Sequence, residues 1–174
     1  MMDITQNSIE AKAETVRVLF EESGDLIKME ITDNGCGMSS EVLAKAQDPF
    51  YTDPKKHAAR KVGFGLPFLI QACQSCGGEF SIKSVEGEGT DVNCSFGRDN
   101  IDTPPVGGLV STVVALMTMD REYELEFHRK RDGDQYSVTR GELLEALGEL
   151  ETVDSIILAR DYVTLLEENL ATEN

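Results

Sequence analysis

The chain has 174 residues, 40% of them hydrophobic and 28% charged. This is typical of a globular protein with a packed core, built as one domain or as one domain with an appendage. Its 32 acidic and 16 basic side chains leave a net charge of −16. Nucleic acids and anionic membranes are bound by clustered Lys and Arg, so we expect no nucleic-acid partner and no membrane partner.

We expect neither a membrane-spanning helix nor a signal peptide in this sequence. It holds no run of 18 apolar residues, the length that a membrane-spanning helix requires. It does not open with a basic region followed by an apolar stretch, the pattern of a signal peptide. The four cysteines lack a secretory context, so we expect reduced thiols in a cytoplasmic protein.

The first hundred residues alternate between helical and strand patterns. Residues 1–13 predict a helix that starts abruptly without a capping turn, so we expect this helix, or an element before it, to be cut short. Alternating β-branched residues then predict a hairpin around Ser23-Gly24-Asp25. A short helix capped by Ser39 or Ser40, an aperiodic loop, an apolar helix and two strands follow; from the hairpin onward the elements span 14–21, 26–32, 41–47, 48–62, 63–76, 80–84 and 90–96.

The composition changes near residues 99–105, and we place a domain boundary after residue 97. The expected domains are 1–97 and 98–174, the second being a small α+β appendage with no motif of known use. It carries 7 basic and 17 acidic side chains, a net charge of −10. Its patterns predict an apolar helix, a two-stranded hairpin, a helix capped by Thr139 and a last amphipathic helix, at 106–119, 122–128 with 135–138, 140–148 and 155–170.

A glycine loop, Asp33-Asn34-Gly35-Cys36-Gly37-Met38, follows the second strand of the first hairpin directly. A carboxylate at the end of a strand can accept a hydrogen bond from the exocyclic amine of adenine. Guanine carries a carbonyl there and is refused, because an unpaired buried acceptor is costly. The glycines allow the backbone to approach a purine. Asp-Asn-Gly is also ordinary turn chemistry, so this motif alone is only suggestive.

A second glycine motif, Gly63-Phe64-Gly65-Leu66-Pro67, opens the apolar helix. Backbone N–H groups at the start of a helix hold phosphate oxygens. The motif matches neither the phosphate loop that ends in Gly-Lys-Ser/Thr nor the dinucleotide fingerprint. On the first helix, the amide oxygen of Asn7 is a suitable Mg²⁺ ligand when phosphates supply the others.

The order of these pieces is more informative than any one of them. An Asn on a helix, a hairpin, DNGCGM, DPFYT, a basic loop, GFGLP and Gly-Glu-Gly-Thr follow one another. In this order, residues 1–97 resemble the Bergerat-fold ATP-binding domain shared by gyrase-type topoisomerases, ninety-kilodalton heat-shock chaperones, histidine kinases and mismatch-repair ATPases (GHKL). The resemblance implies an α/β two-layer sandwich, with a mixed, mostly antiparallel sheet, helices on one face, and ATP bound between the helices and a lid.

The resemblance also implies roles for individual residues. Asn7 would ligate Mg²⁺ and Asp33 would bind the adenine amine, assisted through a water molecule by Thr90. Gly35, Gly37 and Met38 would shape the base pocket. Phe50 would precede the lid, and a second glycine box would cover the phosphates, formed by Gly63, Phe64, Gly65 and Leu66.

The lid is the stretch from Pro54 to Lys61. Its cations Lys55, Lys56, Arg60 and Lys61 lie in an otherwise acidic protein. We expect them to contact the nucleotide phosphates, although a solvated surface loop would have the same composition.

The position that carries a water-activating Glu in the mismatch-repair and gyrase branches holds Asp3 here. Its carboxylate is one methylene shorter than that of Glu, so Asp3 is a candidate general base with reduced reach. An acid in the first turn of a helix is explained equally well by the helix dipole.

The motifs look most like those of histidine kinases. The only histidines are His57 in the lid and His128 on an expected strand, and neither lies on a long helix ahead of the ATP domain. Three functions therefore stay open: an ATP-binding regulator or kinase that acts on a protein partner, a slow ATPase whose lid drives a partner, and a nucleotide sensor without chemistry. The sequence leaves the oligomeric state open. Cys73 and Cys76 form a single Cys pair, and we expect no zinc or redox role for them.

Overall fold

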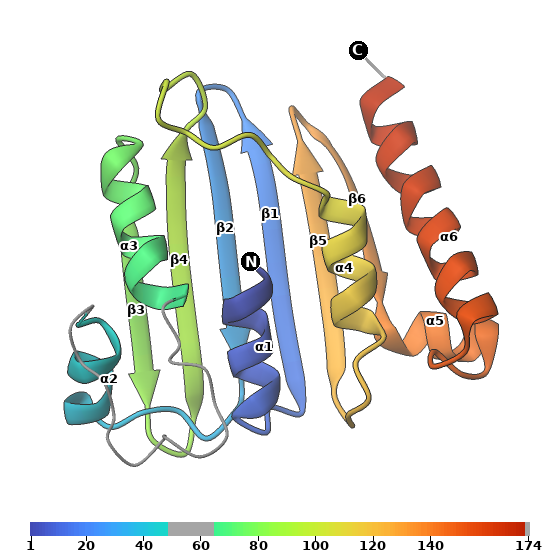
Figure 1. Cartoon of the computed structure of the whole chain (residues 1–174), viewed down its shortest axis with the longest axis horizontal. Helices are drawn as coiled ribbons and strands as arrows, with labels where there is room; N and C mark the ends of the chain where they lie inside the picture. Colours follow the sequence, from blue (N-terminus) through green and yellow to red (C-terminus); the bar gives the residue numbers. More distant parts are fainter. Residues whose placement is uncertain (49–64, 173–174) are drawn as a thin grey trace.

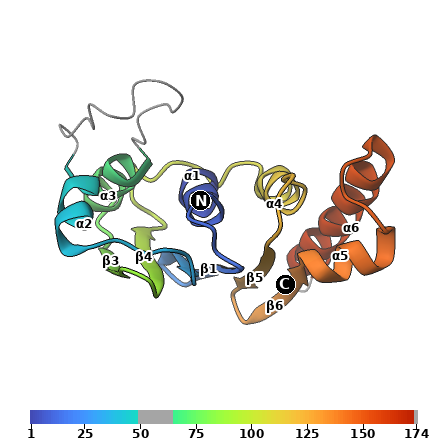
Figure 2. The ribbon, with the colours of Figure 1, turned by 90° about the horizontal axis from the view of Figure 1, so that it is seen from below.

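The computed structural model describes residues 1–48 and 65–172. Six strands form one sheet in the order β3-β4-β2-β1-β5-β6. Helices α1, α3 and α4 cover one face of this sheet, and Figure 2 shows them together above it. The expected two-layer architecture, with a mixed, mostly antiparallel sheet, is therefore confirmed. Every pair of neighbouring strands is antiparallel except β1 and β5.

The elements follow the predicted order closely (Figure 1). Thr139 caps α5 with a capping box to Glu142, and the Ser39 side chain caps α2, as local side-chain chemistry predicts. The bounds in chain order are α1 Met2–Glu10, β1 Thr15–Ser23, β2 Leu26–Asp33, α2 Ser40–Ala46, α3 Gly65–Ser75, β3 Phe80–Val85, β4 Gly89–Gly97, α4 Leu109–Met117, β5 Glu124–Arg131, β6 Asp134–Thr139, α5 Arg140–Leu147 and α6 Val153–Thr172.

The core lies between the sheet and the helices. Alternate residues of β2 point toward the helices, so that Ile27, Met29 and Ile31 are buried while the residues between them are exposed. The same alternation continues to the end of the strand, where the position that faces the helices is Asp33. The period of two in the strand thus carries a carboxylate to the edge of the apolar core.

The segment beyond residue 97 joins the same sheet. Strand β5 lies parallel to β1, with Val16 opposite Leu125 and Val18 opposite Phe127. The expected helix, hairpin and two further helices are all present, and they extend the sheet at its β1 edge. Strands from both sides of residue 97 share this one sheet. The division into domains 1–97 and 98–174 remains a prediction.

A buried arginine ties the last helix to the sheet. Arg129 of β5 is 1% exposed and forms ion pairs with Glu22 of β1 and with Glu167 of α6, at 3.2 Å for the latter. Its guanidinium also lies over the ring of Phe20, 5.2 Å from the centroid. The Tyr136 hydroxyl donates to the other Glu167 oxygen at 2.9 Å. Burial and the neighbouring Glu167 carboxylate raise the pKa of Tyr136, so this hydroxyl stays protonated as a donor.

Candidate nucleotide-binding site

The glycine loop begins at Asp33, which is 9% exposed at the end of β2. Its Oδ1 accepts the Gly35 N–H at 2.8 Å, and its Oδ2 accepts the Ser8 hydroxyl at 2.5 Å. An ionised carboxylate has about four acceptor positions. Two donors therefore fix the orientation of the group and leave it able to accept from a ligand amine.

The loop runs so close to the turn between β3 and β4 that two positions accept only glycine. Gly37 has φ +58° and Gly89 has φ +131°. A Cβ on Gly37 would overlap the carbonyl group of Val85, and a Cβ on Gly89 would overlap the carbonyl oxygen of Asp33. Both glycines thus let three backbone segments meet beside Asp33.

Hydrogen bonds hold the rest of the loop in place. The Cys36 N–H donates to the Ala11 carbonyl at 3.0 Å, and the Cys36 carbonyl accepts from Gly87 at 2.8 Å. The Asn34 side-chain oxygen accepts the Thr15 N–H at 2.9 Å. The loop is therefore tied to the end of α1, to β1 and to the β3–β4 turn before any ligand arrives.

Thr90 lies opposite Asp33 in the antiparallel pairing of β2 with β4. Residues directly opposite each other share a face of the sheet, so Thr90 and Asp33 both face the helices. The Thr90 hydroxyl is 2.8 Å from the Ser84 hydroxyl, which donates to the Gly89 carbonyl at 3.0 Å. Either hydroxyl can donate in this pair. When Ser84 donates to Gly89, Thr90 donates to Ser84, and the Thr90 oxygen keeps acceptor capacity for a bridging water.

Helix α1 brings Asp3 and Asn7 to one exposed side, since they are four residues apart. Asp3 lies against the first residue of α3, because a Cβ on Gly65 would be 2.9 Å from the Asp3 Cβ. Within residues 1–48 and 65–172 the Asn7 side chain makes no hydrogen bond. This part of α1 therefore faces the N-terminus of α3, and the positive end of a helix dipole favours an anion.

These side chains fit Mg²⁺ held together with phosphates rather than by protein alone. Carboxylate and amide oxygens are the ligands that Mg²⁺ prefers. Among the described residues no three His, Cys, Asp or Glu side chains gather in a way that could hold a metal ion. Asn7 would supply one oxygen, and most of the coordination shell would come from the nucleotide and water.

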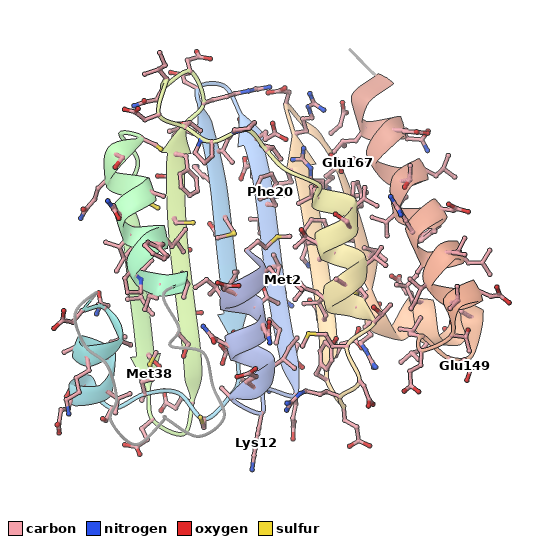
Figure 3. All side chains as sticks on the ribbon, in the orientation of Figure 1. Met2, Lys12, Phe20, Met38, Glu149 and Glu167 are labelled. Carbon is pink, nitrogen blue, oxygen red and sulfur yellow. The ribbon has the colours of Figure 1, made fainter. Side chains whose placement is uncertain are left out.

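Of the other predicted residues, Met38 and Leu66 lie in the described part of the chain and the rest lie outside it. Met38 is half-buried near the lower ends of the strands, beside α2 (Figure 3). The Leu66 side chain is 9% exposed and packs in the core, so only its backbone is available to a ligand. The remaining residues lie outside the described part of the chain, and their roles stay predictions: Phe50, Lys55, Lys56, Arg60, Lys61, Gly63 and Phe64.

Sequence reasoning missed Ser8 and Gly89 as members of this site. The Gly-Glu-Gly-Thr string pointed to the region of Gly89, but the contact with Asp33 depends on the pairing of β2 with β4. No local signal marks Ser8, which is one of four residues on the buried side of α1. Its partner Asp33 is 25 residues away in the chain.

Two other features lie away from the glycine loops. An apolar cavity of about 270 Å³ opens beside the segment that leads into α4, lined among others by Phe20, Met29, Leu69 and Val106. Its lining contains none of the predicted nucleotide residues.

Burial raises the pKa of Cys73 and raises that of Cys94 to about 12, so both thiols stay protonated.

Comparisons with known proteins identify the family of this chain. The family model for histidine kinase-, DNA gyrase B-, and HSP90-like ATPases matches residues 1–100. A putative sensor protein of Shewanella frigidimarina is 34% identical over 68 residues, which are 39% of this chain and 10% of that protein. An uncharacterized sensor-like histidine kinase of Rhizobium meliloti is 32% identical over 78 residues, which are 44% of this chain and 15% of that protein.

The chain thus spans only a small part of the length of these relatives. Among solved structures, the catalytic domain of the histidine kinase ThkA in a nucleotide-free form matches 55% of this chain and 62% of its own, with 19% identity and a TM-score of 0.42. The match of the family model over residues 1–100 is more than half of the chain. The chain belongs to the family of histidine kinase-, DNA gyrase B-, and HSP90-like ATPases.

Proposed function

We propose that this chain binds ATP with Mg²⁺ and regulates or phosphorylates a protein partner. The carrying observation is the buried Asp33 carboxylate, which Ser8 and Gly35 hold in one orientation beside Thr90. In this proposal Asp33 accepts the adenine amine. A water bound to Thr90 completes the recognition of the base.

The phosphates would extend along α1 toward α3. The first residue of α3 packs against Asp3, and Asn7 is exposed one turn further along α1. Asn7 would contribute an oxygen to Mg²⁺, and the N–H groups at the start of α3 would hold phosphate oxygens. The lysines and the arginine of the lid would neutralise the remaining charge.

The partner is inferred from the histidines. Only His57 and His128 are present in the chain. His128 lies on β5 with its Nε2 3.6 Å from a Glu126 oxygen, and His57 falls outside the described residues. A phosphoryl transfer in the manner of sensor kinases would, in this proposal, use an acceptor outside these 174 residues.

Slow ATP hydrolysis is the second candidate, and the position of Asp3 favours it. Its carboxyl group lies beside Gly65, at the end of α3 that would face the phosphates. A carboxylate there could accept a proton from an attacking water molecule.

Calorimetric titration with Mg·ATP tests the binding of ATP, on which the rest of the proposal depends. The wild type should bind, and Asp33→Asn should lose binding, because an amide that presents its N–H₂ to the adenine amine repels it. Asp25→Asn, in the exposed turn between β1 and β2, is the matched control and should bind like the wild type. Unaltered affinity of Asp33→Asn would overturn the assignment of the site.

Incubation of the protein with γ-labelled ATP and cell extract tests the transfer. Label should appear on another protein with the wild type and not with Asp33→Asn. Intact ATP and no labelled protein under any condition would overturn the kinase role while leaving ATP binding in place.

A further inference from the structure

Helix α6 has a buried face and an exposed apolar stripe. Ala159 and Val163 are fully buried against the rest of the protein. Leu158, Tyr162 and Leu165 are 54%, 47% and 55% exposed. Their spacing of four and three residues places them on one side of the helix, and we call these three residues the α6 stripe.

This helix is unusually rich in exposed apolar side chains. Of the 11 large hydrophobic side chains that are exposed among the described residues, five lie on α6: the stripe, Val153 and Ile157. Single exposed hydrophobic residues are ordinary on a protein surface, but a contiguous group marks an interaction site. Helix α6 lies at the outer edge of the molecule, beyond β6 (Figures 1 and 2).

The stripe is held rigidly by the contacts on the other side of α6. Glu167, labelled in Figure 3, bonds to the buried Arg129 and to the Tyr136 hydroxyl. These interactions fix the rotation of α6 against β5 and β6. A partner would therefore meet a surface that loses little conformational freedom on binding.

The charges around the stripe point to the chemistry of its partner. Asp154 and Asp161 are exposed, and each is three or four residues from a stripe residue. Glu149 and Glu151 are exposed just ahead of the helix. Residues 98–174 carry 17 acidic and 7 basic side chains. This border attracts a basic partner and disfavours a second copy of a chain whose net charge is −16.

From these observations we propose that the α6 stripe docks an amphipathic helix of another protein. That helix has apolar residues at i, i+4 and i+7 and Lys or Arg along the side that meets Asp154 and Asp161. Helix α6 has 20 residues, about 30 Å, so a partner helix of roughly five turns fits along it. Three half-exposed side chains bury little area, which suits a transient complex.

The probe is a 21-residue capped and fluorescein-labelled peptide of Leu and Lys, with Leu at the helical spacing of the stripe. Fluorescence anisotropy should show binding to the wild-type chain and a dissociation constant about ten-fold weaker for the double variant Leu158→Ser, Leu165→Ser. Ile101→Ser is the matched control, since Ile101 is 97% exposed outside α6, and it should bind like the wild type. The same peptide with Glu for Lys should not bind.

Equal affinity of the double variant and the wild type would overturn the proposal. So would a concentration-dependent dimer in analytical ultracentrifugation that the double variant loses, because the stripe would then join two copies. Binding of the wild type to phosphatidylcholine–phosphatidylglycerol vesicles, lost in the double variant, would also overturn it. Circular dichroism and an unchanged affinity for Mg·ATP would establish that the double variant is folded and that its nucleotide site is intact.

Discussion

The Ser8 hydroxyl donates a hydrogen bond to Asp33 Oδ2 at 2.5 Å, and both side chains are buried. The bond joins α1 to the end of β2 across the candidate adenine pocket. The Gly35 N–H donates to the other carboxylate oxygen. The bond from Ser8 therefore fixes the remaining rotation of the Asp33 carboxylate. A fixed carboxylate binds its ligand without first losing rotational entropy.

Ser8→Ala should therefore weaken Mg·ATP binding. We expect a loss of about 1–1.5 kcal/mol, or roughly ten-fold in the dissociation constant, measured by calorimetry. Gln6→Ala is the control, because Gln6 bonds to Glu10 at 3.2 Å and not to the site. Equal affinities for the two variants would show that Ser8 does not orient Asp33.

The adenine amine should decide which nucleotide binds. Inosine triphosphate carries a carbonyl oxygen in place of that amine, so it would face the Asp33 carboxylate with acceptor against acceptor. We expect affinity to fall by about 100-fold or more relative to ATP, as for a buried polar group left unpaired. Competition of both nucleotides against a fluorescent ATP analogue measures the ratio. A ratio near one would mean that Asp33 does not read the base.

Asp3 is tested by phosphate release at steady state. If its carboxylate accepts a proton from water beside Gly65, Asp3→Asn should slow release by about 100-fold or more, with Mg·ATP affinity nearly unchanged. Asp120→Asn, in the segment between α4 and β5, serves as the control. A rate that does not change in Asp3→Asn would remove Asp3 from the chemistry and leave it as a residue that packs against α3.

Two neighbouring glycines should differ sharply in their tolerance of a side chain. Gly89→Ala places a Cβ on the Asp33 carbonyl oxygen, whereas Gly87→Ala meets nothing within 4 Å. Both have positive φ, which alone costs about 1 kcal/mol for alanine. We expect Gly89→Ala to lose at least about 3 kcal/mol and roughly 8 °C in Tm, and Gly87→Ala about a third of this. Similar Tm values for the two variants would contradict the close approach of Gly89 to the Asp33 carbonyl.

Arg129 should be far more important for stability than Arg17. Arg129→Met leaves Glu22 and Glu167 without their buried cation, so we expect a loss of about 3–5 kcal/mol in urea unfolding. Arg17 pairs with Glu126 at 2.8 Å with its side chain 62% exposed, and Arg17→Met should cost at most about 1 kcal/mol. Because β1 and β5 pair, unfolding should follow a single transition. Equal losses for the two variants would contradict the importance of the buried Arg129 ion pairs. Two transitions would contradict the shared sheet.

Local chemistry was sufficient to predict most of the elements. The alternation in β1 and β2, the capping box of Thr139 and the turn at Asp132-Gly133 each act over a few residues. The family and the nucleotide motifs were readable for a related reason. The residues Asp33 to Met38 are contiguous, and their order relative to Asn7 and Gly65 is a property of the chain itself.

The tertiary structure decided how these pieces meet. The parallel pairing of β1 with β5 brings residues about 109 positions apart into contact, and no local pattern specifies a partner at that separation. Ser8 and Gly89 became part of the site only through packing against Asp33. Such contacts depend on the register between elements, which burial of the whole core sets. The sequence by itself thus determined the family and the kind of ligand to expect, and the fold determined which side chains orient the carboxylate that we propose reads the base.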